Sequence, residues 1–197
     1  MNSIVSYEGR DLSALEDMKN YYSWILETLA PFVRGDVIEY GAGAGTISER
    51  LLPIADKLTL VEPSSNLTEL LRRRFAKDLR VTIIGEAAET NAPHIASNSV
   101  DTVVLVNVLE HTKDDQALLA QLVRMLKPGG HLLIFVPALQ ILMSKLDRIH
   151  GHFRRYHRSD LEKKIAAAGG NVMLCRYFDL LHVPTWFVLN TILGATT

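Results

Sequence analysis

Three glycines at alternate positions follow a short apolar stretch of the sequence. They are Gly41, Gly43 and Gly45, and a predicted helix begins directly after them. Because glycine has no Cβ, such a loop lets the backbone approach a ligand at the amino end of the helix. Thr46 stands where a dinucleotide fingerprint places its third glycine, so the spacing is G-x-G-x-G. The loop therefore predicts a cofactor site and makes NAD the weaker candidate.

A carboxylate follows the next apolar stretch. Glu62 comes directly after residues 58–61, which form a predicted strand. At that place a carboxylate can accept hydrogen bonds from both hydroxyls of a ribose held over the glycine loop. We therefore expect an adenosine-type ligand. The alternative is a solvated acid at the end of a strand.

A basic segment lies in the C-terminal half of the chain. Residues 145–158, KLDRIHGHFRRYHR, contain five Lys or Arg residues and one Asp, a local charge of +4. Because the segment follows a predicted strand, it should overhang the carboxyl edge of the sheet, where ligands of open α/β folds bind. Arg154 and Arg155 could clamp a phosphate or carboxylate, with Tyr156 packing against an apolar portion. The alternative is a solvated lid or a cluster of salt bridges. The histidines of this segment have no carboxylate or cysteine at ligand spacing, so no metal site is expected.

The elements that must position these groups alternate between strand and helix. The predicted strands are 36–40, 58–61, 81–84, 100–106, 131–136 and 172–178, and the predicted helices are 12–33, 46–52, 66–77, 114–126 and 159–168. This order predicts an α/β, Rossmann-like fold, with a mostly parallel sheet flanked by helices. A chain of 197 residues, 48% of them apolar, suits one domain over residues 1–197. That domain would comprise the N-terminal helix, a cofactor core at 36–136 and a substrate-side segment at 137–197.

Five motifs in order resemble the class I S-adenosylmethionine-dependent methyltransferases, especially the subgroup that includes ubiquinone and menaquinone biosynthesis enzymes. The motifs are VIEYGAGAG, LTLVEPS, IGEAAE, SVDTVVLVNVLEH and MLKPGGHLLIFVP, and the resemblance spans about residues 18–180. It implies S-adenosylmethionine as cofactor and S-adenosylhomocysteine as product. The sequence departs from the family in offering no segment for a seventh strand. We therefore expect either a truncated chain or a replaced strand, for example one supplied by a partner chain.

The resemblance implies a set of cofactor-binding residues. They are Tyr21, Glu39, Gly41, Ala42, Gly43, Gly45, Glu62, Pro63, Glu86, Ala87 and Asn107. Glu39, the glycine loop and Asn107 are expected along the methionine part of the cofactor. Glu62 is expected on the ribose, with Pro63 beside the sugar and the base.

The adenine end departs slightly from the family pattern. Glu86 stands where relatives usually have an aspartate that receives the adenine amino group, and the backbone N–H of Ala87 would meet the ring. Tyr21 resembles a tyrosine that many relatives place over the cofactor. For Tyr21, packing in the core is the alternative.

The sequence specifies fewer residues for the place where the methyl group would be transferred than for the rest of the cofactor site. Methyl transfer from a sulfonium is an in-line displacement, for which positioning supplies most of the rate. His111 follows the fourth predicted strand and is the candidate general base if the acceptor is a hydroxyl or a weakly acidic carbon. The alternative is a structural or pocket-shaping histidine. The stretch GHFRRYHRSDL resembles a subgroup of these methyltransferases with a G-H-x-R-R-Y stretch, some members of which resemble partners of glycosyltransferases acting on lipid-linked sugars.

Composition limits the classes of binding partner and the cellular compartment that we expect for this protein. A net charge of −1 and a short basic segment argue against nucleic acid. The single cysteine, Cys175, excludes an internal disulfide. The N-terminus lacks the pattern of a signal peptide, and the apolar stretch 183–193 is about half the ~20 residues of a spanning helix. We expect a cytoplasmic protein, with peripheral membrane contact through residues 180–193 as one option.

The motifs together predict a methyltransferase that uses S-adenosylmethionine. The expected acceptor is a small molecule or a lipid- or sugar-linked molecule, with negative charge as one option. The main alternative is a non-catalytic Rossmann-like module that binds a cofactor or nucleotide. An NAD-dependent oxidoreductase is the third interpretation, against which stand the missing third glycine and the lack of a tyrosine–lysine pair.

Overall fold

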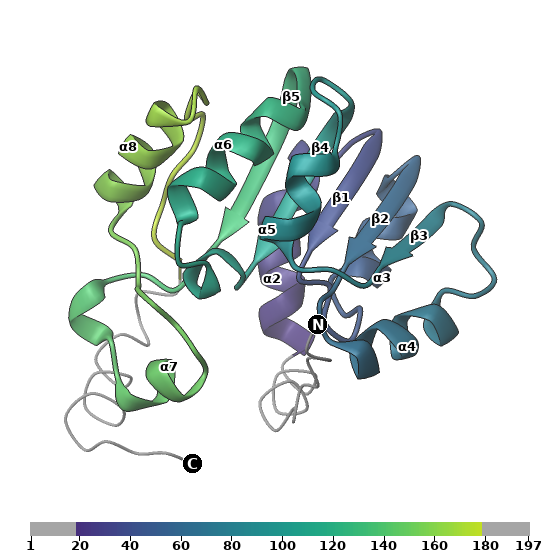
Figure 1. Cartoon of the computed structure of the whole chain (residues 1–197), viewed down its shortest axis with the longest axis horizontal. Helices are drawn as coiled ribbons and strands as arrows, with labels where there is room; N and C mark the ends of the chain where they lie inside the picture. Colours follow the sequence, from purple (N-terminus) through teal and green to yellow (C-terminus); the bar gives the residue numbers. More distant parts are fainter. Residues whose placement is uncertain (1–18, 179–197) are drawn as a thin grey trace. The chain divides into compact units, whose positions relative to one another are not determined.

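Five strands of the computed structural model form one parallel sheet in the order β3-β2-β1-β4-β5 (Figure 1). The structure describes residues 19–178. The strands are β1 Asp36–Tyr40, β2 Lys57–Val61, β3 Val81–Ile84, β4 Val100–Val106 and β5 Leu126–Phe135. Every neighbouring pair is parallel, which confirms the predicted α/β, Rossmann-like fold. The strand order reverses at β1, and ligands of open α/β sheets bind outside the carboxyl ends of the strands at such a point.

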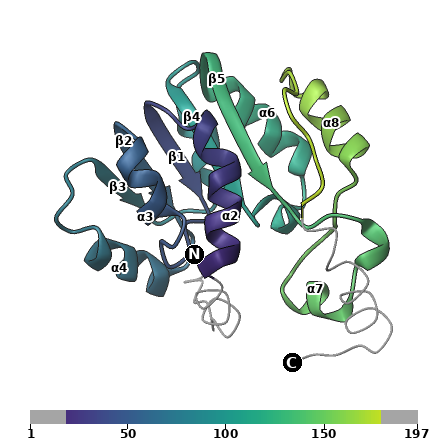
Figure 2. The ribbon, with the colours of Figure 1, turned by 180° about the vertical axis from the view of Figure 1, so that it is seen from behind.

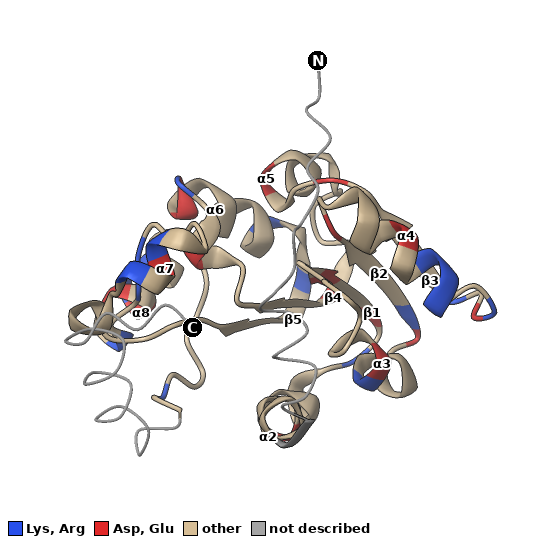
Figure 3. Cartoon of the chain, turned by 90° about the horizontal axis from the view of Figure 1, so that it is seen from below, with Lys and Arg blue, Asp and Glu red and all other residues tan. Residues whose placement is uncertain are grey.

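Helices cover both faces of this sheet. Residues 19–178 contain the helices α2 Lys19–Leu29, α3 Ser48–Leu51, α4 Ser65–Arg74, α5 Ala88–Asn91, α6 Asp115–Met125, α7 Lys145–Ile149 and α8 Arg158–Ala167, of which α2 to α5 belong to the same compact unit as the sheet. Figure 2 shows α2 and α3 on one face, and Figure 3 shows α5 on the other. Val103, Val104 and Leu105 are therefore all buried although successive side chains point to opposite faces.

The chain divides into two compact units. Within the described residues, the first unit contains the whole sheet, with residues 19–106 and 124–135. The second contains residues 107–123 and 136–178, and so holds most of α6 together with α7 and α8. The expectation of a single domain stays a prediction.

Several element boundaries differ from the sequence-based ones. The first helix runs from Lys19 to Leu29 and continues as a 3-10 turn at Ala30–Phe32, and its predicted start at 12–18 lies outside the described residues. β5 begins at Leu126, earlier than predicted. The segment before Arg158, which we expect to be irregular, contains the short helix α7.

The predicted sixth strand at 172–178 is wrong. This stretch contains no strand in the described part of the chain, and Met173 and Leu174 are 71% and 56% exposed. An apolar stretch becomes a strand only where a neighbouring edge supplies hydrogen bonds and cover for its side chains. A periodicity argument cannot show whether that edge is available.

Candidate functional site

The glycine loop follows β1 and turns back over the end of β2. Gly41, Gly43 and Gly45 have φ angles of 71°, 55° and 88°, a region that L side chains rarely adopt. The backbone N–H of Gly41 donates to the carbonyl of Val61 at 2.8 Å. At Gly45 a Cβ would lie 2.9 Å from Phe75 Cε2, so the third glycine is needed for the close packing of α4. This packing role of Gly45 could not be predicted from the spacing of the glycines.

Glu62 ties the glycine loop to the end of β2. Its Oε2 accepts the backbone N–H of Gly43 at 3.0 Å, and its Oε1 accepts the backbone N–H of Ser64 at 2.9 Å. The residue is only 5% exposed. A carboxylate has about four acceptor positions, so two backbone donors leave capacity for hydroxyl donors. The arrangement fits a ribose, and that contact stays a prediction.

Glu39 lies inside the sheet and contacts α3. Its Oε2 accepts the hydroxyl of Ser48 at 2.6 Å, and the residue is 2% exposed. Burial raises the pKa of Glu39 to about 8, the Ser48 hydrogen bond opposes this rise, and the charge of Glu62 adds to it. The carboxyl is therefore protonated over much of the neutral range, and its expected place near the methionine part of the cofactor stays a prediction.

Glu86 belongs to a hydrogen-bonded chain that the sequence analysis missed. Asn91 Nδ2 donates to Glu86 Oε2 at 3.1 Å, and the hydroxyl of Tyr40 donates to Asn91 Oδ1 at 3.1 Å. Asn91 and Tyr40 are buried, whereas Glu86 is exposed. These two hydrogen bonds link Tyr40, at the end of β1, to Glu86, in the loop after β3. The side chain of Glu86 is therefore held in a fixed orientation. Ala87 is the residue before α5.

Three further predicted cofactor residues take different positions. The ring of Tyr21, on α2, lies edge-on to that of Phe135 at the end of β5, with centroids 6.1 Å apart. Core packing would give such a contact, and the expected place of Tyr21 over the cofactor stays a prediction. Pro63 is exposed beside Glu62. Asn107 follows β4 with a φ of 54°, a conformation that asparagine tolerates better than most residues.

His111 lies in the second unit beside another histidine. The rings of His111 and His152 meet at 86° with centroids 4.7 Å apart. The neighbouring Glu110 is completely buried, and burial raises its pKa to about 7. His152 Nδ1 lies 2.9 Å from Asp147 Oδ1. Sequence reasoning found His111 but not Glu110 or Asp147, because their environment depends on segments far apart in the chain.

The predicted substrate residues contact two buried acids. Arg154 Nη1 lies 2.7 Å from Asp115 Oδ2, and the hydroxyl of Tyr156 donates to the same oxygen at 2.9 Å. Arg155 donates to both oxygens of Asp147, at 2.9 and 3.0 Å. These contacts agree with the salt-bridge alternative. The anion clamp formed by Arg154 and Arg155 stays a prediction.

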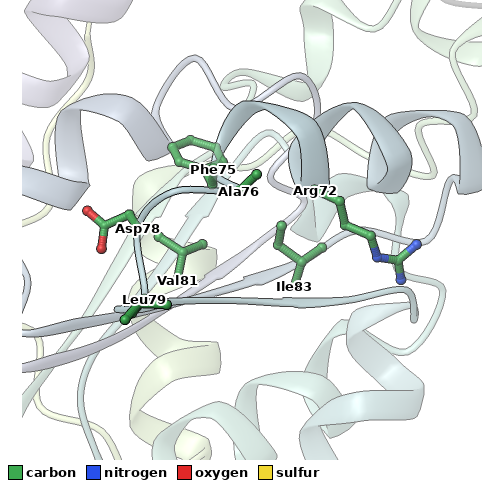
Figure 4. Close-up of a pocket in the computed structure, with 7 residues that line it drawn as sticks. All are labelled: Arg72, Phe75, Ala76, Asp78, Leu79, Val81 and Ile83. Atoms are coloured by element: carbon green, nitrogen blue, oxygen red, sulfur yellow. The ribbon is translucent and has the colours of Figure 1, made fainter.

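A surface pocket lies where α4 and the following turn meet β3 (Figure 4). The residues that line it are Arg72, Phe75, Ala76, Asp78, Leu79, Val81 and Ile83. None of the predicted cofactor- or substrate-binding residues is among them. We therefore assign this pocket no part in the candidate site.

Residues 38–134 match the model of a family described as "Methyltransferase domain". Over 125 residues the chain is 27% identical to an uncharacterized methyltransferase of Bacillus mycoides, an alignment that covers 62% of this chain and 56% of that protein. The chain thus spans just over half the length of this curated relative. The family match extends from β1 to β5 and includes the glycine loop, Glu62, Glu86 and Asn107.

Two solved structures show the same fold. One is a SAM-dependent methyltransferase of Leishmania major, with a TM-score of 0.69 and 16% identity, covering 87% of this chain and 71% of that one. The other is a SAM-dependent methyltransferase of Thermotoga maritima, with a TM-score of 0.58 and 26% identity, covering 76% of this chain and 70% of that one.

Proposed function

We propose that this chain, which belongs to the class I S-adenosylmethionine-dependent methyltransferases, transfers the methyl group of that cofactor to an anionic acceptor. The acceptor is a small molecule or a lipid- or sugar-linked molecule. The observation that carries the cofactor part is the Glu62 carboxylate, which is held against the glycine loop and keeps acceptor capacity for ribose hydroxyls.

Methyl transfer from a sulfonium requires the protein mainly to bind and orient the two reactants. When bound, S-adenosylmethionine would supply a methyl group on a sulfonium. A nucleophile of the acceptor would bond to the methyl carbon as the carbon–sulfur bond breaks, and S-adenosylhomocysteine would leave with the electron pair of that bond. The residues of the chain contribute by holding the two reactants collinear at close approach, which can account for a large part of the rate. In this role the loop after β1 and Glu62 bind the cofactor.

The surface of α7 supports an acceptor with negative charge and an apolar portion. Lys145, Arg148 and Ile149 share one face of α7 because they are three and four residues apart. Lys145 and Arg148 are exposed, and Ile149 is 61% exposed. Phe153, in the following loop of the same unit, is 53% exposed. Exposed cations beside exposed apolar side chains suit a phosphate on a lipid or another apolar carrier.

Membrane contact would be peripheral under this proposal. Among the helices of residues 19–178, none is both long and apolar enough to span a bilayer. The stretch 180–193, through which such contact is expected, lies outside the described residues. Within the described residues, we propose that the exposed side chains of α7 reach a lipid-linked acceptor at the membrane surface.

Calorimetry and a methyl-transfer assay test the proposal. Titration of the full chain with S-adenosylmethionine, S-adenosylhomocysteine and NAD should give saturable binding of the first two only. The chain is then incubated with methyl-labelled cofactor and separate fractions of phospholipids, lipid-linked phosphosugars and water-soluble phosphorylated metabolites. Label should enter one of these fractions. Binding of NAD alone would overturn the assignment, and cofactor binding without label transfer to any fraction would favour the non-catalytic module.

Charge reversal on α7 tests the acceptor part. The double variant Lys145→Glu, Arg148→Glu should lower transfer to the labelled fraction at least tenfold and leave cofactor affinity unchanged. The matched control is Lys77→Glu, Lys163→Glu, which reverses two exposed cations outside α7. Equal transfer by both double variants would contradict an anionic acceptor at α7.

A further inference from the structure

Glu110 is a buried acid without a partner. Its side chain is 0% exposed, and neither carboxylate oxygen has a hydrogen-bond partner. Buried polar groups are nearly always hydrogen-bonded, because an unpaired one costs free energy and an unpaired charge costs much more. A carboxylate in this position therefore calls for a donor or a cation. Methyl transfer as proposed above makes no use of it.

Two histidines complete a set of ligands around Glu110. One ligand atom each from Glu110, His111 and His152 lie within 4.8 Å of one another. Two imidazole nitrogens and one carboxylate oxygen form a donor set that binds Zn²⁺ and similar ions. Glu110 and His111 are adjacent in the chain, whereas His152 comes from the basic segment. The set therefore exists only in the folded protein.

His152 is oriented by a second carboxylate. Its Nδ1 lies 2.9 Å from Asp147 Oδ1, so Nε2 is the ring nitrogen left to bind a cation. Asp147 is 2% exposed and accepts two hydrogen bonds from Arg155 and two from Ser144. A carboxylate that binds the other nitrogen of a metal-binding histidine fixes its tautomer and raises its basicity. The surroundings of His152 thus match those of a metal ligand.

Backbone contacts hold the ligands together. The N–H of Phe153 donates to the carbonyl of Glu110 at 2.9 Å, directly beside His152. The buried hydroxyl of Tyr156 lies 3.2 Å from the carbonyl of Leu109 and donates to Asp115. The turn at Leu109–His111 and the loop at 152–156 are therefore joined by two hydrogen bonds.

We propose that Glu110, His111 and His152 form a binding site for a divalent transition-metal ion of the Zn²⁺ type. The site lies within the second unit and does not depend on the proposed methyl transfer. A cation there would satisfy the buried carboxylate of Glu110. Three protein ligands leave at least one coordination position open, as in catalytic rather than structural zinc sites. We assign that open position to an oxygen of the anionic acceptor, an assignment that rests on the proposed function. His111 then acts as a metal ligand instead of a general base.

Metal binding can be measured without any activity. The full chain is stripped with a chelator, and Zn²⁺ is titrated with a competing dye while Co²⁺ is followed by its visible absorption. Wild type should bind one equivalent of Zn²⁺, and Co²⁺ should give the spectrum of nitrogen and oxygen ligands. The variants Glu110→Gln and His152→Ala should weaken Zn²⁺ binding on the order of 100-fold. Zn²⁺ should also raise the melting temperature of wild type but not that of Glu110→Gln.

The matched control is His150→Ala. The ring of His150 lies 6.2 Å from that of His152, but His150 is not part of the ligand set. This variant should bind Zn²⁺ within threefold of wild type. Equal weakening by His150→Ala and His152→Ala would indicate an adventitious histidine patch and overturn the site, as would the absence of stoichiometric binding by wild type. If His152→Ala fails to fold, Glu110→Gln still decides, because it keeps the shape of the side chain. Calorimetry with S-adenosylhomocysteine reports separately on the proposed function.

Discussion

The carboxylate of Glu62, at the end of β2, accepts the backbone N–H of Gly43, in the loop after β1, at 3.0 Å. One side chain thus serves both as the expected ribose anchor and as the link that holds the glycine loop in place. Its other oxygen accepts the N–H of Ser64 at 2.9 Å. Removing this carboxylate should therefore affect ligand binding and loop geometry together.

Glu62→Ala should raise the dissociation constant for S-adenosylhomocysteine about ten- to hundredfold, because each hydrogen bond to a charged group contributes about 1.5–3 kcal/mol. Isothermal titration calorimetry measures the change. Glu69→Ala is the control, since Glu69 lies on the nearby α4 with a carboxylate that is half exposed. An affinity of Glu62→Ala equal to that of the control would remove the ribose assignment.

Gly45→Ala should destabilise the protein more than Gly169→Ala. The φ angles are +88° and +87°, so both variants carry the same backbone strain. A Cβ at position 45 would lie 2.9 Å from Phe75 Cε2 and 3.0 Å from Leu71 Cδ2, whereas nothing lies within 4 Å at position 169. We expect an additional loss of about 1–3 kcal/mol in the free energy of unfolding for Gly45→Ala, measured by urea denaturation. Equal losses would show that α4 does not pack against the loop as described.

Glu39 makes stability fall as the pH rises. The folded protein keeps the proton of this carboxyl up to about pH 8, whereas the unfolded chain releases it near the ordinary value of 4.5. Between these values the native state binds more protons, so the free energy of unfolding decreases with pH, by on the order of a few kcal/mol. Glu39→Gln keeps an acceptor for the Ser48 hydroxyl and removes the titration. Denaturation from pH 5 to pH 8.5 should give a flatter profile for this variant than for wild type, and Glu89→Gln, an exposed change, should follow wild type.

Asp115 has the opposite pH dependence. Burial by itself would raise the pKa of Asp115, but hydrogen bonds from Lys164, Arg154 and Tyr156 hold it below its ordinary value of 3.8. Its contribution to stability is therefore present above that value and is lost as the pH falls through the lowered pKa. Asp115→Asn should cost about 2 kcal/mol or more at pH 7, since two cations lose their buried partner.

The cost of Asp115→Asn should shrink as the pH falls below 3.8 toward pH 3, because the unfolded chain takes up this proton before the native state does. Urea denaturation at both pH values measures it, with the exposed change Asp160→Asn as control. A cost that stays constant down to pH 3 would mean that the charge of Asp115 contributes little.

Helices and strands whose formation depends on neighbouring residues in the sequence could be predicted, whereas those that depend on distant parts of the fold could not. The glycine loop and the five strands of the sheet follow from residues adjacent in sequence, and the structure confirms these strands with small shifts of their ends. The stretch 172–178 has a comparable apolar pattern, yet Met173 and Leu174 are largely exposed. Strand formation there depends on a free edge, which is a property of the whole sheet.

Some residues of the candidate site could likewise be predicted from the sequence, whereas the partners of others could not. Glu62 was predictable because an acid at the end of the second strand must lie beside the loop that follows the first, whatever the rest of the chain does. The basic segment was predictable as a cluster of charge, but its partners were not. Arg154 meets Asp115 and Arg155 meets Asp147, and no spacing rule connects these residues.

The amino-acid sequence by itself determined the type of sheet, the position of the glycine loop and the acid that faces it, because all three depend on short patterns that a parallel αβ order brings to one edge. Only the tertiary structure decided that Glu110 is buried without a partner and that His111 and His152 lie beside it. Burial and the meeting of distant segments are properties of packing, and no local pattern encodes them.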